Sequence, residues 1–143
     1  MSRIGVFVCH CGTNIAGTVD VARVAEAMKA EPGVVFATDY KYMCSEPGQQ
    51  MVKDMIKEHK LDRIVICSCT PRMHENTFRK MLKDTDVNPY MLEIANIREQ
   101  CSWVHTDKEK ATEKAIALAR MAVAKVGRDF PLFTSTIPIH KKA

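Results

Sequence analysis

The sequence predicts an α/β fold: a small open, mainly parallel four-stranded sheet with flanking helices, arranged as a half-Rossmann or flavodoxin-like three-layer sandwich. The length of 143 residues is that of one compact domain. Hydrophobic residues make up 46% of the chain, which is enough apolar material for one core. Short β-branched apolar runs alternate with segments of helical periodicity, and this alternation is typical of parallel β-α units.

Four short apolar runs are expected to form the strands. The first covers residues 3–9, and its unbroken apolar character is typical of a strand buried on both faces. The second and third are expected at residues 34–38 and 64–67. Residues 89–94 are expected to form the fourth.

The first two intervening segments have helix signals. Apolar residues recur at the spacing of one helical face, and the pair Pro32-Gly33 ends this pattern. The face consists of Val21, Val24, Ala25 and Met28. Ser45 is expected to cap a second helix, with Pro47 in its first turn.

The second half of the chain is expected to contain two more helices and an extended tail. A short helix is predicted over residues 74–83, and a capping box at 106–109 predicts a long helix that ends near Gly127. Beyond it, prolines interrupt the apolar residues. We therefore expect residues 1–127 to form one α/β domain and residues 128–143 to form an extended linker or docking tail.

Composition and charge exclude several classes of protein. No apolar run approaches the roughly 18–20 residues needed to cross a bilayer, and the first residues lack a signal-peptide pattern. We therefore expect a cytoplasmic protein without a membrane partner. The net charge of +4 is mild and aromatic residues make up only 6% of the chain, so a nucleic-acid surface is not expected.

Six cysteines in a chain without a secretory signal indicate metal ligation or redox chemistry rather than disulfides. All six follow or end predicted strands, and the carboxyl ends of parallel strands meet at one edge of a sheet. Converging thiolates suit an iron–sulfur cluster, and they also suit zinc. The absence of any Cys-x-x-Cys pair argues against ferredoxin loops, zinc ribbons and thioredoxin-like redox motifs. The six are Cys9, Cys11, Cys44, Cys67, Cys69 and Cys101.

Four stretches of the sequence resemble the N-terminal domain of the heterodisulfide reductase A-subunit. They are Cys9–Gly17, Tyr42–Gln49, Cys69–Glu75 and Ala95–His105, in that order. The resemblance runs from about residue 3 to residue 126. It implies a 4Fe–4S cluster with non-standard cysteine spacing, in a protein that also has a flavin-binding domain and ferredoxin-type inserts. It further implies a complex that carries out flavin-based electron bifurcation and heterodisulfide reduction.

Within the resembling stretches, the expected cluster ligands are Cys11, Cys44, Cys69 and Cys101. Cys9 is the alternative to Cys11 as the fourth ligand. Cys67 is expected to be a small buried hydrophobe.

The expected function is an electron-transfer module that carries one 4Fe–4S cluster. A structural zinc-binding interaction domain is the alternative, and a thiol redox enzyme is a third class. The domain alone is not expected to be catalytic, although it would belong to an oxidoreductase complex. Because the chain has no Gly-x-Gly-x-x-Gly fingerprint, FAD is expected only in a neighbouring domain or subunit. The expected partners are that flavin-containing domain, other redox subunits, or a second copy of the chain.

Overall fold

The computed structural model describes residues 1–140 and confirms the predicted α/β sandwich. Four parallel strands form one sheet in the order β2-β1-β3-β4. The strands are β1 (Ile4–Cys9), β2 (Val34–Tyr40), β3 (Arg63–Ser68) and β4 (Leu92–Asn96). The helices are α1 (Val21–Lys29), α2 (Glu46–His59), α3 (Pro71–Leu82) and α4 (Lys108–Val126), and a π-helical turn, η1 (Arg98–Ser102), follows β4.

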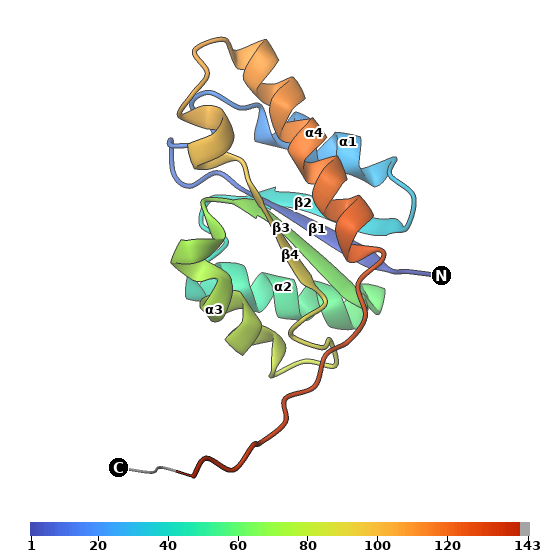
Figure 1. Cartoon of the computed structure of the whole chain (residues 1–143). Helices are drawn as coiled ribbons and strands as arrows, with labels where there is room; N and C mark the ends of the chain where they lie inside the picture. The colour runs from blue at the N-terminus through green and yellow to red at the C-terminus, as the bar shows by residue number, and fades with distance from the viewer. Residues whose placement is uncertain (141–143) are drawn as a thin grey trace.

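Helices cover both faces of the sheet (Figure 1). One hydrophobic cluster packs α1 and α4 against the sheet, and a second cluster packs α2 and α3 against the opposite face. The central strands β1 and β3 have almost no exposed surface, which explains their unbroken apolar runs.

The strand order places a topological switch point between β1 and β3. The chain leaves β1 toward α1 on one face and leaves β3 toward α3 on the other face. Such a divergence opens a crevice outside the carboxyl ends of the two strands, where open α/β sheets bind ligands. The amino-terminal part of the chain lies at the opposite end of the sheet (Figure 1).

Several element boundaries confirm the expectations, whereas the starts of α3 and β4 differ from them. Ser45 caps α2, and Gly127 is the C-cap of α4. Helix α3 begins at Pro71, three residues earlier than expected, because the Thr70 hydroxyl accepts the Arg72 N–H and caps it. Strand β4 begins later than expected, because Asn88 forms a turn that occupies the start of the predicted strand.

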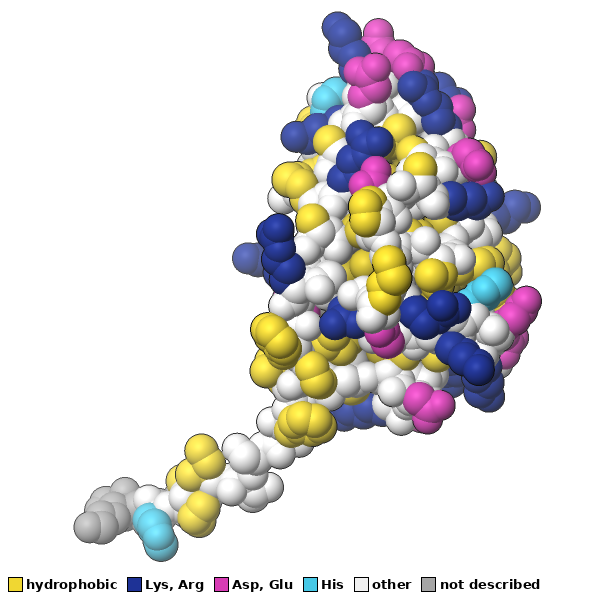
Figure 2. Space-filling view, turned by 90° about the vertical axis from the view of Figure 1, so that its right-hand side faces the viewer, with side chains coloured by type: hydrophobic (Ala, Val, Ile, Leu, Met, Phe, Trp, Pro, Cys, Tyr) yellow, Lys and Arg dark blue, Asp and Glu magenta, His cyan; other side chains and the backbone are white. Residues whose placement is uncertain are grey.

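The segment after α4 extends away from the body of the protein. Residues 129–140 lie in no helix or strand, and the Leu132 carbonyl accepts a hydrogen bond from Asn88 Nδ2 at 2.9 Å. Apolar side chains gather near the base of this tail, whereas acidic and basic side chains are mixed over the rest of that face (Figure 2). The predicted tail reaches residue 143, so its last three residues lie outside the described range. Among residues 1–140, no helix has the length and apolar character needed to span a membrane.

Candidate functional site

The loop after β1 carries two of the cysteines. Cys9 ends β1, and Cys11 follows in the left-handed region at φ +50°. Gly12 is also left-handed, at φ +60°, and its N–H donates to the Lys41 carbonyl at 3.3 Å. The positive φ of Gly12 favours glycine, because side chains rarely adopt that conformation. The turn brings Cys11 next to the segment that carries the following cysteine.

Cys44 and Cys69 occupy equivalent positions, each directly before the N-cap residue of a helix. Ser45 caps α2, where its hydroxyl accepts the Gly48 N–H at 3.3 Å, and Thr70 caps α3. The N-terminus of a helix carries a partial positive charge, which stabilises a nearby thiolate. Two of the predicted ligands therefore lie beside a helix N-terminus.

The thiols of Cys9, Cys11, Cys44 and Cys69 lie close enough that the charge of one acts on the pKa of another. Burial raises the pKa of Cys9, and the charges of Cys11 and Cys44 raise it further. Burial also raises the pKa of Cys44 and the pKa of Cys69, and in both the charge of Cys11 adds to the rise. Because these thiolates repel one another, the site favours a cation among them.

The sulfur atoms of Cys9 and Cys11 have different hydrogen-bond donors. Cys9 Sγ accepts the N–H groups of Cys11 at 3.3 Å and Met43 at 3.4 Å, and the residue is only 4% exposed. Cys11 is half-buried and its Sγ accepts from Arg98 Nη1 at 2.9 Å. N–H donors to sulfur are among the features that tune iron–sulfur sites, so both residues have suitable surroundings.

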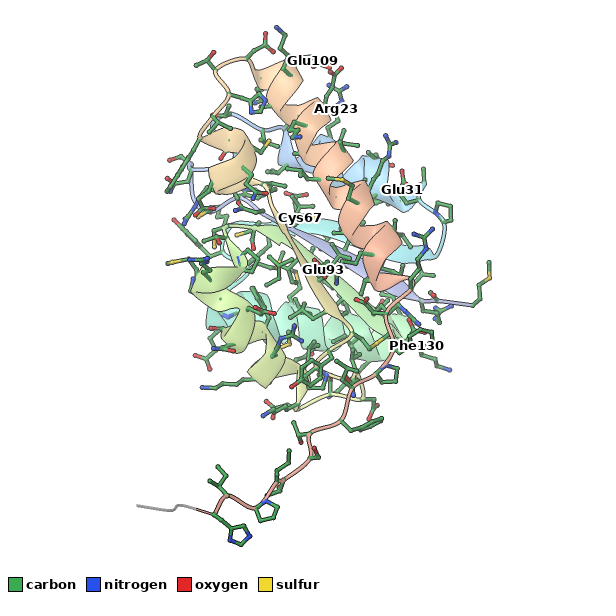
Figure 3. All side chains as sticks on the ribbon, viewed as in Figure 1. Arg23, Glu31, Cys67, Glu93, Glu109 and Phe130 are labelled. Atoms are coloured by element: carbon green, nitrogen blue, oxygen red, sulfur yellow. The ribbon has the colours of Figure 1, made fainter. Side chains whose placement is uncertain are left out.

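Neither Cys101 nor Cys67 acts on the pKa of Cys9, Cys44 or Cys69. The Cys101 thiol is buried and donates to the Ala111 carbonyl of α4 at 3.1 Å. Burial raises the pKa of Cys101, and the charged neighbour that acts on it is Lys114 rather than another cysteine. Cys67 lies on the sheet beneath α4 (Figure 3). It has no exposed surface, as expected for a buried hydrophobe, and burial raises its pKa to about 12.

The π-helix η1 lies beside this site and was not predicted. Asn96 Oδ1 accepts the N–H groups of Arg98 at 3.3 Å and Glu99 at 3.1 Å, which turns the chain at the end of β4. The Ser102 hydroxyl donates to the Asn14 carbonyl at 2.8 Å and ties η1 to the loop after β1. Single π-helical turns are rare and are often found at functional sites. The available sequence signal was the asparagine that ends β4, which is typical of an Asx turn.

Three further residues of the resembling stretches have contacts that the sequence did not predict. Trp103 is 57% exposed, and the centre of its ring lies 4.7 Å from the Arg98 guanidinium. His10 pairs with Asp39, with 2.6 Å between Nε2 and Oδ2. His105 Nδ1 lies 2.7 Å from the Cys101 carbonyl, so that histidine contacts backbone rather than thiols.

The donor set fits an iron–sulfur cluster or another soft metal, although the side chains are not closed around one point. Within residues 1–140, no three His, Cys, Asp or Glu side chains are grouped as metal ligands, and the six cysteines are free thiols. Four of the thiols nevertheless come from three loops at the switch-point end of the sheet.

Comparison with known proteins gives consistent matches. The chain is 56% identical over 127 residues to the CoB–CoM heterodisulfide reductase iron-sulfur A-subunit 1 of Methanopyrus kandleri, covering 88% of this chain and 19% of that protein. It is 50% identical over 142 residues to the H(2):CoB-CoM heterodisulfide,ferredoxin reductase A-subunit of Methanothermobacter thermautotrophicus, covering 99% of this chain and 22% of that protein. A protein of Archaeoglobus profundus, named as similar to the heterodisulfide reductase A-subunit, is 48% identical over 141 residues, covering 98% of this chain and 20% of that protein.

These relatives are much longer than the present chain, which spans about a fifth of their length. No family model matches the chain. The matched region nevertheless covers nearly the whole chain, and the four resembling stretches, with five of the six cysteines, therefore lie within it. The chain therefore belongs to the family of heterodisulfide reductase A-subunits and corresponds to one domain of such a protein.

Proposed function

We propose that this chain is an electron-transfer module that carries one 4Fe–4S cluster within a heterodisulfide reductase-type complex. The observation that carries the proposal is the group of four neighbouring thiols, supplied by three loops at the switch-point end of the sheet. Four thiolates are the usual ligand set of such a cluster. One of the relatives is itself named an iron-sulfur subunit.

The bound cluster would supply one-electron chemistry, and the chain would supply its ligands and surroundings. The helix N-termini at Cys44 and Cys69 support the thiolate form of these residues. The backbone N–H groups around Cys9 and the guanidinium of Arg98 offset negative charge. The low exposure of Cys9 and Cys69, 4% and 6%, limits water at the sulfur atoms, and this helps to set a cluster's potential.

We assign Cys11, Cys44 and Cys69 as three of the ligands and leave two residues for the fourth position. Cys101 lies in one of the four resembling stretches. Its thiol, however, donates to the Ala111 carbonyl, and no other cysteine acts on its pKa. The charges of Cys11 and Cys44 raise the pKa of Cys9, and the charge of Cys9 raises the pKa of Cys69. These mutual charge effects favour Cys9 over Cys101 as the fourth ligand.

The wider role follows from the relatives and extends the proposal beyond this chain. The matched A-subunits of CoB–CoM heterodisulfide reductases are about five times longer, so we propose that the flavin and further redox centres belong to neighbouring domains or subunits. The module would exchange single electrons with them during flavin-based bifurcation and heterodisulfide reduction in the cytoplasm. The domain itself would form and break no substrate bonds.

Metal analysis of the chain, purified without oxygen, tests the proposal. We expect a brown protein with iron and acid-labile sulfide in equal amounts and a paramagnetic resonance signal after reduction with dithionite. A colourless protein with zinc and no sulfide would establish the structural zinc alternative. A protein that binds neither metal would refute both.

Single substitutions then identify the ligands. Replacing Cys11, Cys44 or Cys69 by serine is expected to lower the iron content, and Cys67→Ala is the matched control that keeps it. Cys9→Ser and Cys101→Ser decide the fourth position, because only the ligand should lose iron while the other variant loses stability alone. Full iron retention in the Cys11, Cys44 and Cys69 variants contradicts the assignment.

A further inference from the structure

The guanidinium of Arg98 contacts three side chains at the thiol site, the group formed by Cys9, Cys11, Cys44 and Cys69. Nη1 donates to Cys11 Sγ at 2.9 Å, while Nε and Nη2 donate to Glu99 Oε1 at 3.1 and 2.8 Å. Its face lies over the ring of Trp103 at 4.7 Å. The side chain is only 14% exposed, so little water screens its charge. Arg98 therefore has one fixed orientation, in which a donor points at a thiol.

The partner carboxylate connects Arg98 to a second thiol-bearing loop. Glu99 Oε2 accepts the N–H of Thr70 at 2.8 Å, and Thr70 directly follows Cys69. The Arg98 and Glu99 pair thus joins η1 to the loop after β1 and to the loop after β3. These two loops flank the switch point, where they would otherwise diverge toward opposite faces of the sheet.

The charge of Arg98 also acts on thiols that it does not touch. Burial raises the pKa of Cys44 and the pKa of Cys69, and the charge of Arg98 opposes the rise in each. Although burial alone would raise the pKa of Glu99, its bond to Arg98 holds that pKa below the usual value. The hydrogen bonds from Nε and Nη2 to Glu99 keep the guanidinium in place.

We propose that Arg98 is a positioning residue of the thiol site, which holds the Cys11 loop in place and supplies a fixed positive charge that raises the reduction potential of the bound cluster. This inference rests on the proposed function. Reduction adds one electron and no proton, so the negative charge at the site increases by one. A nearby, poorly screened cation stabilises the reduced form more than the oxidised form.

The test compares potentials in three variants by redox titration with dithionite, followed by paramagnetic resonance. Arg98→Met is expected to keep its iron but to lower the equilibrium constant for reduction at least tenfold, which equals about 59 mV for a one-electron couple. Arg98→Lys retains the charge and is expected to restore at least half of that shift. Arg72→Met is the matched control, since Arg72 is an exposed arginine in the first turn of α3. Arg72→Met is expected to change the equilibrium constant for reduction less than threefold.

Hydrogen exchange in the metal-free chain tests the positioning role separately. The Gly12 amide, bonded to the Lys41 carbonyl, is expected to exchange at least tenfold faster in Arg98→Met and at the parent rate in Arg72→Met. If Arg98→Met does not retain iron, the potential of Arg98→Lys and the exchange rate of the Gly12 amide decide the outcome. An unchanged potential together with unchanged exchange, or equal effects of Arg98→Met and Arg72→Met, overturns the inference. A parent protein without iron overturns the proposed function instead.

Discussion

Replacing Gly48 by alanine should destabilise the protein, although the same change usually stabilises a helix. Gly48 lies in the first turn of α2, three residues after its cap. In an exposed helix, alanine is favoured over glycine by about 1 kcal/mol. Here the new Cβ would lie 2.4 Å from the Tyr42 carbonyl oxygen, 2.6 Å from the Met43 carbonyl oxygen and 2.8 Å from Met43 Cα. All three are backbone atoms, so no side chain can move aside.

The magnitude follows from these two opposing effects. Overpacking costs about 1–3 kcal/mol, and contacts with two carbonyl oxygens belong at the upper end of that range. Subtracting the helical preference of about 1 kcal/mol leaves a net loss of about 2 kcal/mol in the free energy of unfolding. Gly127→Ala is the matched control, because its nearest atom lies 3.3 Å away and its φ is −61°. That change should stay within about 0.5 kcal/mol.

Urea unfolding of the metal-free proteins measures both changes, provided that the slopes of the transitions agree. Gly48→Ala should also lower the iron content, because relief of the contacts displaces the loop that carries Cys44. A Gly48→Ala protein as stable as the parent, with full iron, would refute the close-contact reasoning.

Two other substitutions test the environments described above. Cys67→Ser places a hydroxyl in an apolar site with no exposed surface, so it should lower the free energy of unfolding by about 1–3 kcal/mol while the iron content stays at the parent level. Loss of iron in that variant would place Cys67 among the ligands. Lys60 ends α2 in the left-handed region at φ 50°, so Lys60→Gly should raise the thermal midpoint, with a gain of up to about 1 kcal/mol. A lower midpoint would contradict the conformational argument.

The fold was predictable because local signals and burial agree over most of the chain. The apolar runs of β1 and β3 are buried on both faces, and the Ser45 hydroxyl marks the start of α2 by accepting the Gly48 N–H. The start of β4 was not predictable, because the side chain of Asn88 forms a turn within an otherwise strand-like run. Its hydrogen bond to the tail is a tertiary contact that no local pattern encodes.

The candidate site was predictable only to the level of the sheet edge. Parallel strands bring Cys9, Cys11, Cys44 and Cys69 to one end, and this required nothing beyond strand order. The position of Cys101 depends on η1, whose bonds to Asn96 and to the loop after β1 are tertiary. Sequence spacing could therefore place Cys101 after β4, but it could not direct its thiol toward α4.

The fold and the proposed cluster have separate sources of stability. Two hydrophobic clusters enclose the sheet, and no buried side-chain nitrogen or oxygen in the described part of the chain lacks a hydrogen-bond partner. The loops of the thiol site are also joined by protein contacts, from Gly12 to Lys41 and from Arg98 to Cys11. Zinc fingers, in contrast, depend on their metal because they have little core of their own. Because both hydrophobic clusters and these loop contacts are made by the protein's own residues, removal of iron should leave the sheet intact.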